Sequence, residues 1–189
     1  MRRAQAPAAR AADRSRHDRR TASPIRAATV GDAEAICRIY NQGIRDRVAT
    51  LETEERTPEE RAQWLETRSP RHPVLVAEDD GLVVGWASLN VFNARRAYDH
   101  VADLSLYVER EWRGRGVGRR LLEALVARAI ELGYHKLVLA AFPWNAAGMR
   151  AYGRAGFREV GIYREQGRLD GRWVDTVVME KILEGPSAH

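Results

Sequence analysis

The chain has 189 residues, a length typical of one domain, and a formal net charge of +5 at pH 7. Residues 1–24 hold seven arginines against two aspartates, so the remainder is neutral and does not show the charge expected of a nucleic-acid-binding domain. No apolar run approaches the roughly 20 residues that cross a membrane, and the single cysteine, Cys37, excludes an intramolecular disulfide and a cysteine-built metal site.

These features predict a cytosolic protein with no metal, no membrane partner and no nucleic-acid partner. Residues 1–24 are rich in Arg and Ala and have no sizeable aliphatic side chain before Ile25, so they are predicted to be a disordered tail. The tail is compatible with a transit peptide, a bacterial extension or a start codon placed too early. Residues 185–189 are predicted to be a flexible C-terminus, which leaves one domain over residues 25–184.

The first predicted elements are a short strand at residues 25–28 and a helix from about Asp32 to Ile44, with Thr29 or Asp32 near its cap. A second helix begins at Thr57-Pro58-Glu59-Glu60. There a Thr cap, a Pro at the first helical position and a Glu three residues after the cap coincide. That helix is expected to end before Ser69-Pro70.

The next segment predicts a hairpin. Val74-Leu75-Val76-Ala77 is a buried-looking strand, and Asp80-Gly81 is a turn signal before a second strand over residues 82–89.

The rest of the domain alternates strands with helices. The expected elements are a strand ending at Val108, a helix after Gly116 closed at Gly133, a strand at 136–140, a helix at about 145–155, and two strands at 160–163 and 174–179 around the turn Asp170-Gly171. This order predicts an α/β (α+β) fold with one mixed sheet.

The segment from Arg113 to Gly118 is predicted to bind a phosphate-bearing ligand. It follows the strand-like run Leu104–Val108 and leads into an apolar helical pattern. Glycines at 114, 116 and 118 let the backbone approach a ligand closely. The first N–H groups of a helix have no intrahelical partner and lie at the positive end of its dipole, so they favour an anion.

Two familiar phosphate motifs do not fit this segment. No Lys-Ser or Lys-Thr pair follows the glycines, as a P-loop would require, and the glycine spacing differs from that of a dinucleotide fingerprint. The pattern [Q/R]-x-x-G-x-[G/A] fits with Arg113, Gly116 and Gly118. The plain alternative is a flexible, glycine-rich start of a helix.

Further motifs follow the glycine turn, at Phe142-Pro143-Trp144-Asn145 with Tyr152 and at Gly156-Phe157-Arg158-Glu159-Val160-Gly161. With the order of the elements, they resemble the GCN5-related N-acetyltransferase (GNAT) superfamily, whose members bind the pyrophosphate of coenzyme A with the glycine pattern.

Three other segments are similar to the phosphinothricin N-acetyltransferase branch, with its arsinothricin-resistance relatives, and the similarity covers residues 25–184. These segments are Ala49-Thr50-Leu51-Glu52-Thr53, Ala94-Arg95-Arg96-Ala97-Tyr98-Asp99 and Leu169-Asp170-Gly171-Arg172-Trp173-Val174-Asp175.

The resemblance implies a fold and a coenzyme site. The expected sheet has six to seven strands splayed in the middle, flanked by about four helices. Acetyl-CoA is the expected co-substrate. The expected coenzyme contacts are Leu106, Tyr107, Val108, Arg113, Gly114, Arg115, Gly116, Val117, Gly118 and Asn145. Asn145 is also compatible with a simple N-cap.

The resemblance also implies catalytic residues. Acetyl transfer requires an unprotonated amine, so a carboxylate or an ordered water must accept its proton. Relatives carry a Glu where this chain has Asp103. The shorter Asp103 suggests a water relay, and a structural aspartate is the alternative. Tyr152 matches the thiolate proton donor of many relatives, although phosphinothricin enzymes have a His there, and a packing aromatic is the alternative.

Acceptors of this branch are amino acids with a free carboxylate. Arg95, Arg96 and Tyr98 are therefore the candidate acceptor-binding residues, with surface arginines as the alternative reading. Leu51 falls where close relatives have Phe, which is expected to alter the side chain that is accepted.

The resulting hypothesis is an acetyl-CoA-dependent N-acetyltransferase for the α-amine of a small amino acid or toxic analogue, associated with antibiotic or herbicide resistance and acting as a homodimer by resemblance. The alternatives are an acetyltransferase for methionine sulfone, methionine sulfoximine or a protein N-terminus, and a non-catalytic acyl-CoA-binding module.

Overall fold

The computed structural model describes residues 24–184. The predicted flexible C-terminus at 185–189, and the predicted tail apart from residue 24, lie outside the described residues.

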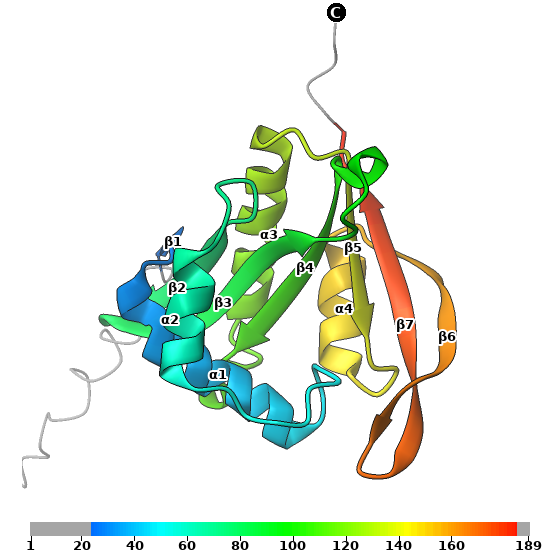
Figure 1. The fold of residues 1–189 in the computed structure, drawn as a ribbon, viewed down its shortest axis with the longest axis horizontal. Coiled ribbons are helices and arrows are strands. Elements are labelled where there is room, and N and C mark those ends of the chain that lie inside the picture. The colour runs from blue at the N-terminus through cyan, green and yellow to red at the C-terminus, as the bar shows by residue number, and fades with distance from the viewer. Residues whose placement is uncertain (1–23, 185–189) are drawn as a thin grey trace, which may run out of the picture.

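Seven strands form one sheet in the order β1-β2-β3-β4-β5-β7-β6 (Figure 1). Adjacent strands are antiparallel except for β4 and β5, which are parallel. The sheet is therefore mixed, as the sequence predicts. The strands are β1 (Ile25–Ala27), β2 (Val74–Asp79), β3 (Leu82–Val91), β4 (Val101–Val108), β5 (Lys136–Ala141), β6 (Arg158–Leu169) and β7 (Arg172–Ile182).

Four α-helices cover the two faces of the sheet, and three short 3-10 helices lie in its connections within residues 24–184. On one face, Ile36 and Ile39 pack with β2 and β3 around the buried Trp86. On the other, Leu121, Leu122 and Leu125 join a larger core with β4, β5 and β7. Both faces thus bury apolar side chains. The helices are α1 (Ala33–Asp46), α2 (Pro58–Glu66), α3 (Val117–Glu131) and α4 (Ala146–Arg154).

Local signals fix the element boundaries. Thr57 accepts a hydrogen bond from the Glu60 N–H at 3.2 Å while the Glu60 carboxylate accepts one from the Thr57 N–H at 2.8 Å, so the predicted capping box is confirmed. Both predicted hairpin turns are also confirmed. Asp80 and Gly81 have φ of 48° and 79°, and the pair at 170–171 has φ of 47° and 80°, as a type I′ turn requires.

The final hairpin is longer than the sequence analysis predicts. β6 and β7 extend well beyond residues 160–163 and 174–179. Most of the added β6 positions are polar or glycine and lie exposed, so the sequence pattern did not mark them as strand. The pairing of β6 with β7 shifts register between Tyr163 and Gly167. Polar, irregular strands lack the alternation by which a strand is recognised in sequence.

The sheet opens between β4 and β5. Their pairing covers only Val101–Asp103 against Lys136–Val138, although β4 continues to Val108 and β5 to Ala141. The splayed sheet of the GNAT resemblance is therefore present, and it makes a cleft in the middle of the molecule.

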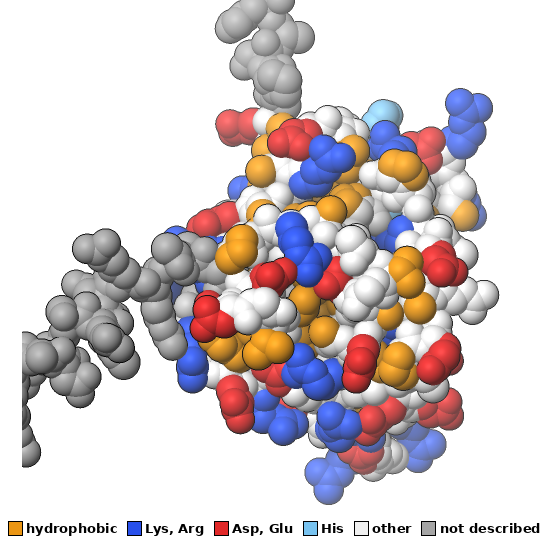
Figure 2. Space-filling view, turned by 90° about the vertical axis from the view of Figure 1, so that its left-hand side faces the viewer, with side chains coloured by type: hydrophobic (Ala, Val, Ile, Leu, Met, Phe, Trp, Pro, Cys, Tyr) orange, Lys and Arg blue, Asp and Glu red, His pale blue; other side chains and the backbone are white. Residues whose placement is uncertain are grey.

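Basic and acidic side chains are interspersed on the side of the molecule where β1 and α2 lie (Figure 2). Figure 2 shows no continuous basic area among the described residues of this face. No helix within residues 24–184 is both long enough and apolar enough to span a bilayer.

Candidate active site

Backbone groups of β4 face the cleft. The Glu109 N–H donates to the Val84 carbonyl at 2.9 Å, so odd-numbered residues of β4 pair with β3. Because antiparallel pairing alternates, the amides of Leu106 and Val108 point away from β3, toward the side where β5 has diverged. These are the positions for which the sequence analysis predicts coenzyme contacts.

The glycine turn is open to a ligand. Gly114 and Gly116 have φ of 76° and 82°, and a Cβ built on either would meet nothing within 4 Å. Gly116 is the N-cap of α3 and offers no side-chain cap, so the first amides of this 15-residue helix remain available to an anion. A Cβ added to Gly118 would lie 3.4 Å from the Val108 side chain, so the start of the helix packs against the end of β4.

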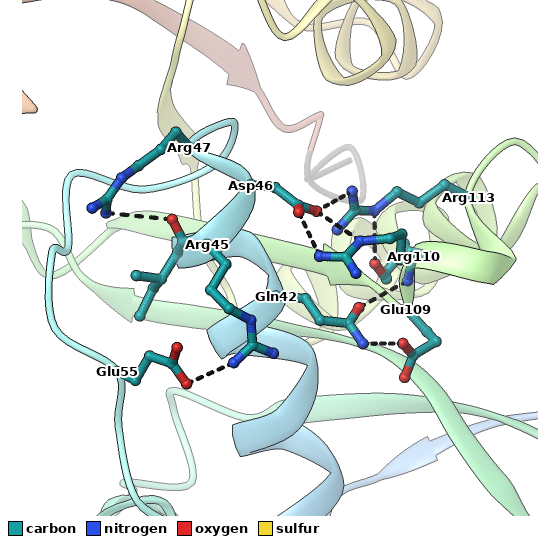
Figure 3. Close-up of polar contacts among 10 residues, drawn as sticks. Gln42, Arg45, Asp46, Arg47, Glu55, Glu109, Arg110 and Arg113 are labelled. Carbon is teal, nitrogen blue, oxygen red and sulfur yellow. Dashed lines mark hydrogen bonds and ion pairs between the residues drawn. The ribbon is translucent and has the colours of Figure 1, made fainter. Parts of the chain in front are cut away.

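The α1 helix holds the residues that precede this turn (Figure 3). The Asp46 carboxylate pairs with Arg110 and with Arg113, each at 2.6 Å. Gln42 accepts a hydrogen bond from the Arg110 N–H at 2.9 Å and donates one to Glu109. The hydrogen bond from Arg110 is the main reason that the pKa of Asp46 is lowered.

The guanidinium of Arg113 is therefore already paired within the protein, and it shares the single carboxylate of Asp46 with Arg110. Its Nε also donates to the Val108 carbonyl at 3.1 Å, which ties the motif arginine back to β4. In the free protein Arg113 thus stabilises the conformation of the turn. The groups of the motif that remain available to a ligand are the main-chain amides.

A pocket lies in the cleft between β4 and β5. One wall is β4, the other is formed by β5, β7 and α4, and the loop after α1 closes one side. Residues lining it are Ala49, Thr50, Leu51, Asp103, Leu104, Ser105, Leu106, Tyr107, Ala140, Ala141, Phe142, Tyr152 and Thr176.

Asp103 is the carboxylate of this pocket. Burial raises its pKa to about 6, and a hydrogen bond from the Asn90 side chain opposes that rise. A carboxyl group with such a pKa is ionised at neutral pH and is a stronger base than an exposed aspartate. Asp103 and Tyr152, which the sequence analysis assigns to catalysis, therefore line one pocket.

A polar network that the sequence analysis misses lies behind Asp103. Asn90 faces Asp103 across the β3–β4 pair. Its Oδ1 accepts hydrogen bonds from Ser88 Oγ and Arg68 Nη1, both at 3.1 Å, while its Nδ2 donates to Ser105 Oγ at 3.1 Å. The two donors fix the orientation of the amide, so that its N–H₂ group faces β4. Only the strand register reveals this arrangement.

Two phenol groups also line the pocket. Burial raises the pKa of Tyr152 to about 12, and the Asp103 charge raises it further in the same direction. Burial likewise raises the pKa of Tyr107, whose hydroxyl is near Thr50. Both phenols are thus protonated at neutral pH and can donate. The Tyr107 ring stacks on Trp86 with 4.7 Å between centroids, so its side chain packs in the α1 face of the sheet.

The remaining predicted residues are divided between the pocket and the surface. Leu51 lines the pocket, and its side chain lies so close to Gly167 on β6 that a Cβ added there would clash with it. Arg95, Arg96 and Tyr98 are exposed and are not among the residues that line it. Asn145 accepts a hydrogen bond from the Gly148 N–H at 3.0 Å and thus caps α4. Arg115 lies over the Trp112 ring.

The model of the acetyltransferase (GNAT) family matches residues 35–157. The chain belongs to the GNAT family. It is an acetyl-CoA-dependent N-acetyltransferase, and phosphinothricin acetyltransferases are among its relatives.

Three similar proteins illustrate the range within this GNAT group. An L-methionine sulfoximine/L-methionine sulfone acetyltransferase of Pseudomonas aeruginosa is 34% identical, over 85% of this chain and 94% of its own. A phosphinothricin acetyltransferase of Sinorhizobium meliloti, solved with acetyl-CoA, has a TM-score of 0.82 at 30% identity, covering 89% and 92% of the two chains. A ribosomal-protein-alanine N-acetyltransferase of Brucella melitensis has a TM-score of 0.82 at 39% identity, covering 85% and 99%.

The described residues fit acetyl-CoA and show no metal site. The open turn and the outward amides of β4 provide donors along one side of the cleft. Within residues 24–184, no three His, Cys, Asp or Glu side chains are grouped so that they could hold a metal ion.

Proposed function

We propose that this GNAT enzyme acetylates the α-amine of a small amino acid or of a toxic analogue such as phosphinothricin, and that Asp103 is its base. When bound, acetyl-CoA supplies the acetyl group as a thioester. The proposal rests on the Asp103 carboxylate, whose pKa is raised and which lies where β4 and β5 separate. On the same strand, the amides of Leu106 and Val108 point away from β3 into the cleft.

Three residues of the pocket, together with the glycine turn, then have defined tasks. Asp103 holds the amine and accepts its proton, directly or through one water. The Leu106 N–H, directed into the cleft, stabilises negative charge on the carbonyl oxygen during transfer. The Tyr152 hydroxyl, protonated at neutral pH, donates a proton to the departing thiolate. The amides of residues 114–118 hold the diphosphate.

A protein N-terminus is the second candidate acceptor. It is favoured by the 39% identity to the Brucella protein named a ribosomal-protein-alanine N-acetyltransferase. Both candidates present a primary α-amine to the same base, so the same assay compares them.

The proposal also includes a homodimer that acts in the cytosol and protects against a toxic amino acid. Support for the dimer comes from the last hairpin, where Val160, Tyr163 and Trp173 expose large apolar side chains. The single cysteine favours the cytosol.

A thiol-release assay of the purified full chain tests the proposed reaction. The amines are phosphinothricin, methionine sulfone, methionine sulfoximine, glutamate and an alanine-initiated peptide. With at least one of these amines, coenzyme A should be released much faster than by hydrolysis of acetyl-CoA in the absence of an amine.

The Asp103→Asn variant should then lower kcat about 10²-fold or more with acetyl-CoA affinity retained, because only the proton acceptor is removed. Calorimetric titration with acetyl-CoA is the control. Parental turnover in this variant would show that another group is the base.

A further inference from the structure

A partly buried guanidinium lies behind the pocket. Arg68 is in the connection between α2 and β2, and its Nη1 donates to Asn90 Oδ1 at 3.1 Å. Its Nε donates to the His72 carbonyl at 2.7 Å and its Nη2 to the Leu89 carbonyl. Burial lowers the pKa of Arg68 to about 10, so the group is still charged at neutral pH. The hydrogen bonds that Arg68 makes with the described residues thus end on neutral oxygens, although a buried cation is costly without a counter-charge. Such a cost is explained if the cation serves the pocket.

Asn90 connects Arg68 to the base. Asn90 is directly opposite Asp103 in the β3–β4 pair, and its Nδ2 donates to Ser105 Oγ at 3.1 Å. Asp103 and Ser105 both line the pocket. One end of the amide therefore meets the guanidinium, and the other end faces the strand that carries the base.

Arg68 is the partner that decides which way this amide points. A guanidinium can only donate, so it requires Oδ1 on its side. The hydroxyls of Ser88 and Ser105 can donate or accept, so they are compatible with either orientation of the amide. With the amide reversed, Nδ2 would meet the donors of Arg68, and Oδ1 could accept a hydrogen bond from Asp103 only when that carboxyl group is protonated.

We propose that Arg68 is a positioning residue that, through Asn90, keeps a hydrogen-bond donor and never an acceptor directed at the Asp103 carboxylate. A fixed donor stabilises the ionised carboxylate, whereas an amide that can reverse would also stabilise the protonated acid. Arg68 thus keeps Asp103 available as a base at lower pH, although it is not among the residues that line the pocket. This inference rests on the proposed function, because it concerns the base of that reaction.

Few ionisable groups among the described residues face Asp103. Tyr107 on its own strand and Tyr152 on α4 are phenols that stay protonated at neutral pH. No Lys, Arg or His is among the residues that line the pocket. The Asn90 amide is therefore the neighbour that can change the titration of Asp103 most.

Carbon-13 NMR of the Asp103 side-chain carboxyl in the full chain measures this titration without any substrate, and its loss in Asp103→Asn assigns the signal. A direct signal is needed because Arg68 lies near His72 and Tyr134. The pKa of His72 is lowered, chiefly by burial, so His72 also titrates at acid pH.

Arg68→Gln and Arg68→Lys form a matched pair of variants, because both lose the forked guanidinium. Gln can accept a hydrogen bond from Asn90 Nδ2 and so permits the reversed amide, whereas Lys can only donate. The midpoint of the Asp103 titration should move up by about one pH unit in Arg68→Gln and stay near the parental value in Arg68→Lys. In an Asn90→Ala background, Arg68→Gln should cause no further change, because both residues act through one amide. The acid limb of kcat/KM should move with the carboxyl signal.

Arg71→Gln is the control for the loss of a positive charge. The Arg71 guanidinium lies over the Tyr134 ring and donates to the Asp99 carbonyl at 2.9 Å, so its removal should leave the titration unchanged.

Equal midpoints in Arg68→Gln and Arg68→Lys would overturn the role of Arg68. A shift that persists without Asn90, or that Arg71→Gln reproduces, would also overturn it, since those results indicate a general effect of charge. If Arg68→Gln does not fold, the parental protein provides the test: the Asn90 NH₂ protons should keep their NOE contacts to β4 when Asp103 becomes protonated, and loss of these contacts would refute a fixed amide. If no amine is acetylated, the proposed function is wrong, whereas the carboxyl titration still decides whether Arg68 orients the amide.

Discussion

Asp103 connects burial to the pH dependence of catalysis. Its pKa is raised from 3.8 to about 6, so the carboxylate is protonated below that pH and cannot accept a proton from the amine. The kcat/KM of the parental enzyme, which reports the pKa values of the free enzyme, should therefore fall as the pH is lowered through about 6. A profile without an acid limb in this region would contradict the assignment of Asp103.

The Asn90 amide should set the position of that limb. Its hydrogen bond favours the charged form of Asp103, so Asn90→Ala should raise the pKa of the base and move the acid limb upward by about one pH unit. Ser88→Ala is the matched control, because Arg68 still holds the amide and Nδ2 still faces β4. Kinetic pH profiles of the two variants measure the difference. If the acid limb lies at the same pH in both variants, Asn90 does not control the pKa of Asp103.

At the scale of elements, one carboxylate of α1 pairs with two arginines at the start of the glycine turn. Asp46 pairs with both Arg110 and Arg113 and is less exposed than either. Asp46→Ala should loosen the turn and raise the KM for acetyl-CoA several-fold, with the KM for the acceptor unchanged.

Glu55→Ala provides the control for Asp46. It removes the pair between Arg45 and Glu55 at 2.7 Å, which lies at the same end of α1 but is about half exposed on both sides (Figure 3). Exposed pairs contribute about 0.2–1 kcal/mol, so neither KM should change. If both variants raise the KM for acetyl-CoA equally, the effect comes from α1 as a whole.

Two glycines, one at the N-cap of α3 and one within α4, separate the requirements of the turn from those of ordinary helix propensity. Gly116 has φ of 82°, so Gly116→Ala should lower the free energy of unfolding by about 1–2 kcal/mol and weaken acetyl-CoA binding. Gly153 lies within α4, where an added Cβ meets nothing, so Gly153→Ala should instead stabilise the fold, by up to about 1 kcal/mol. Chemical denaturation measures both. The same sign of change at both sites would contradict this reasoning.

At the scale of the whole molecule, the last hairpin leaves an apolar surface that a second copy is proposed to cover. Trp173 is 62% exposed, and Trp173→Glu should shift the protein toward monomer in sedimentation velocity, because a charge is then buried at the interface. Leu82 is 66% exposed on the far side of the sheet, at the β2–β3 turn, so Leu82→Glu should leave the mass unchanged. A parental protein that sediments as a monomer would refute the homodimer.

The amino-acid sequence by itself determined the order of the elements and the glycine turn, although not the length of the last hairpin. Capping at Thr57, the turn at Asp80-Gly81 and the glycines at 114 and 116 act over a few residues, so their physical effect can be read locally. The same holds for the short apolar runs that marked the buried strands and for the position of Asp103 just before the turn.

The tertiary structure alone decided which side chains meet in the pocket. Thr176 and Asp103 lie 73 positions apart in the numbering, and they line one pocket because β5 diverges from β4 after Asp103. Asn90 faces Asp103 because of the β3–β4 register. Burial, which raises the pKa of Asp103, depends on contacts between distant segments, and no local pattern encodes it.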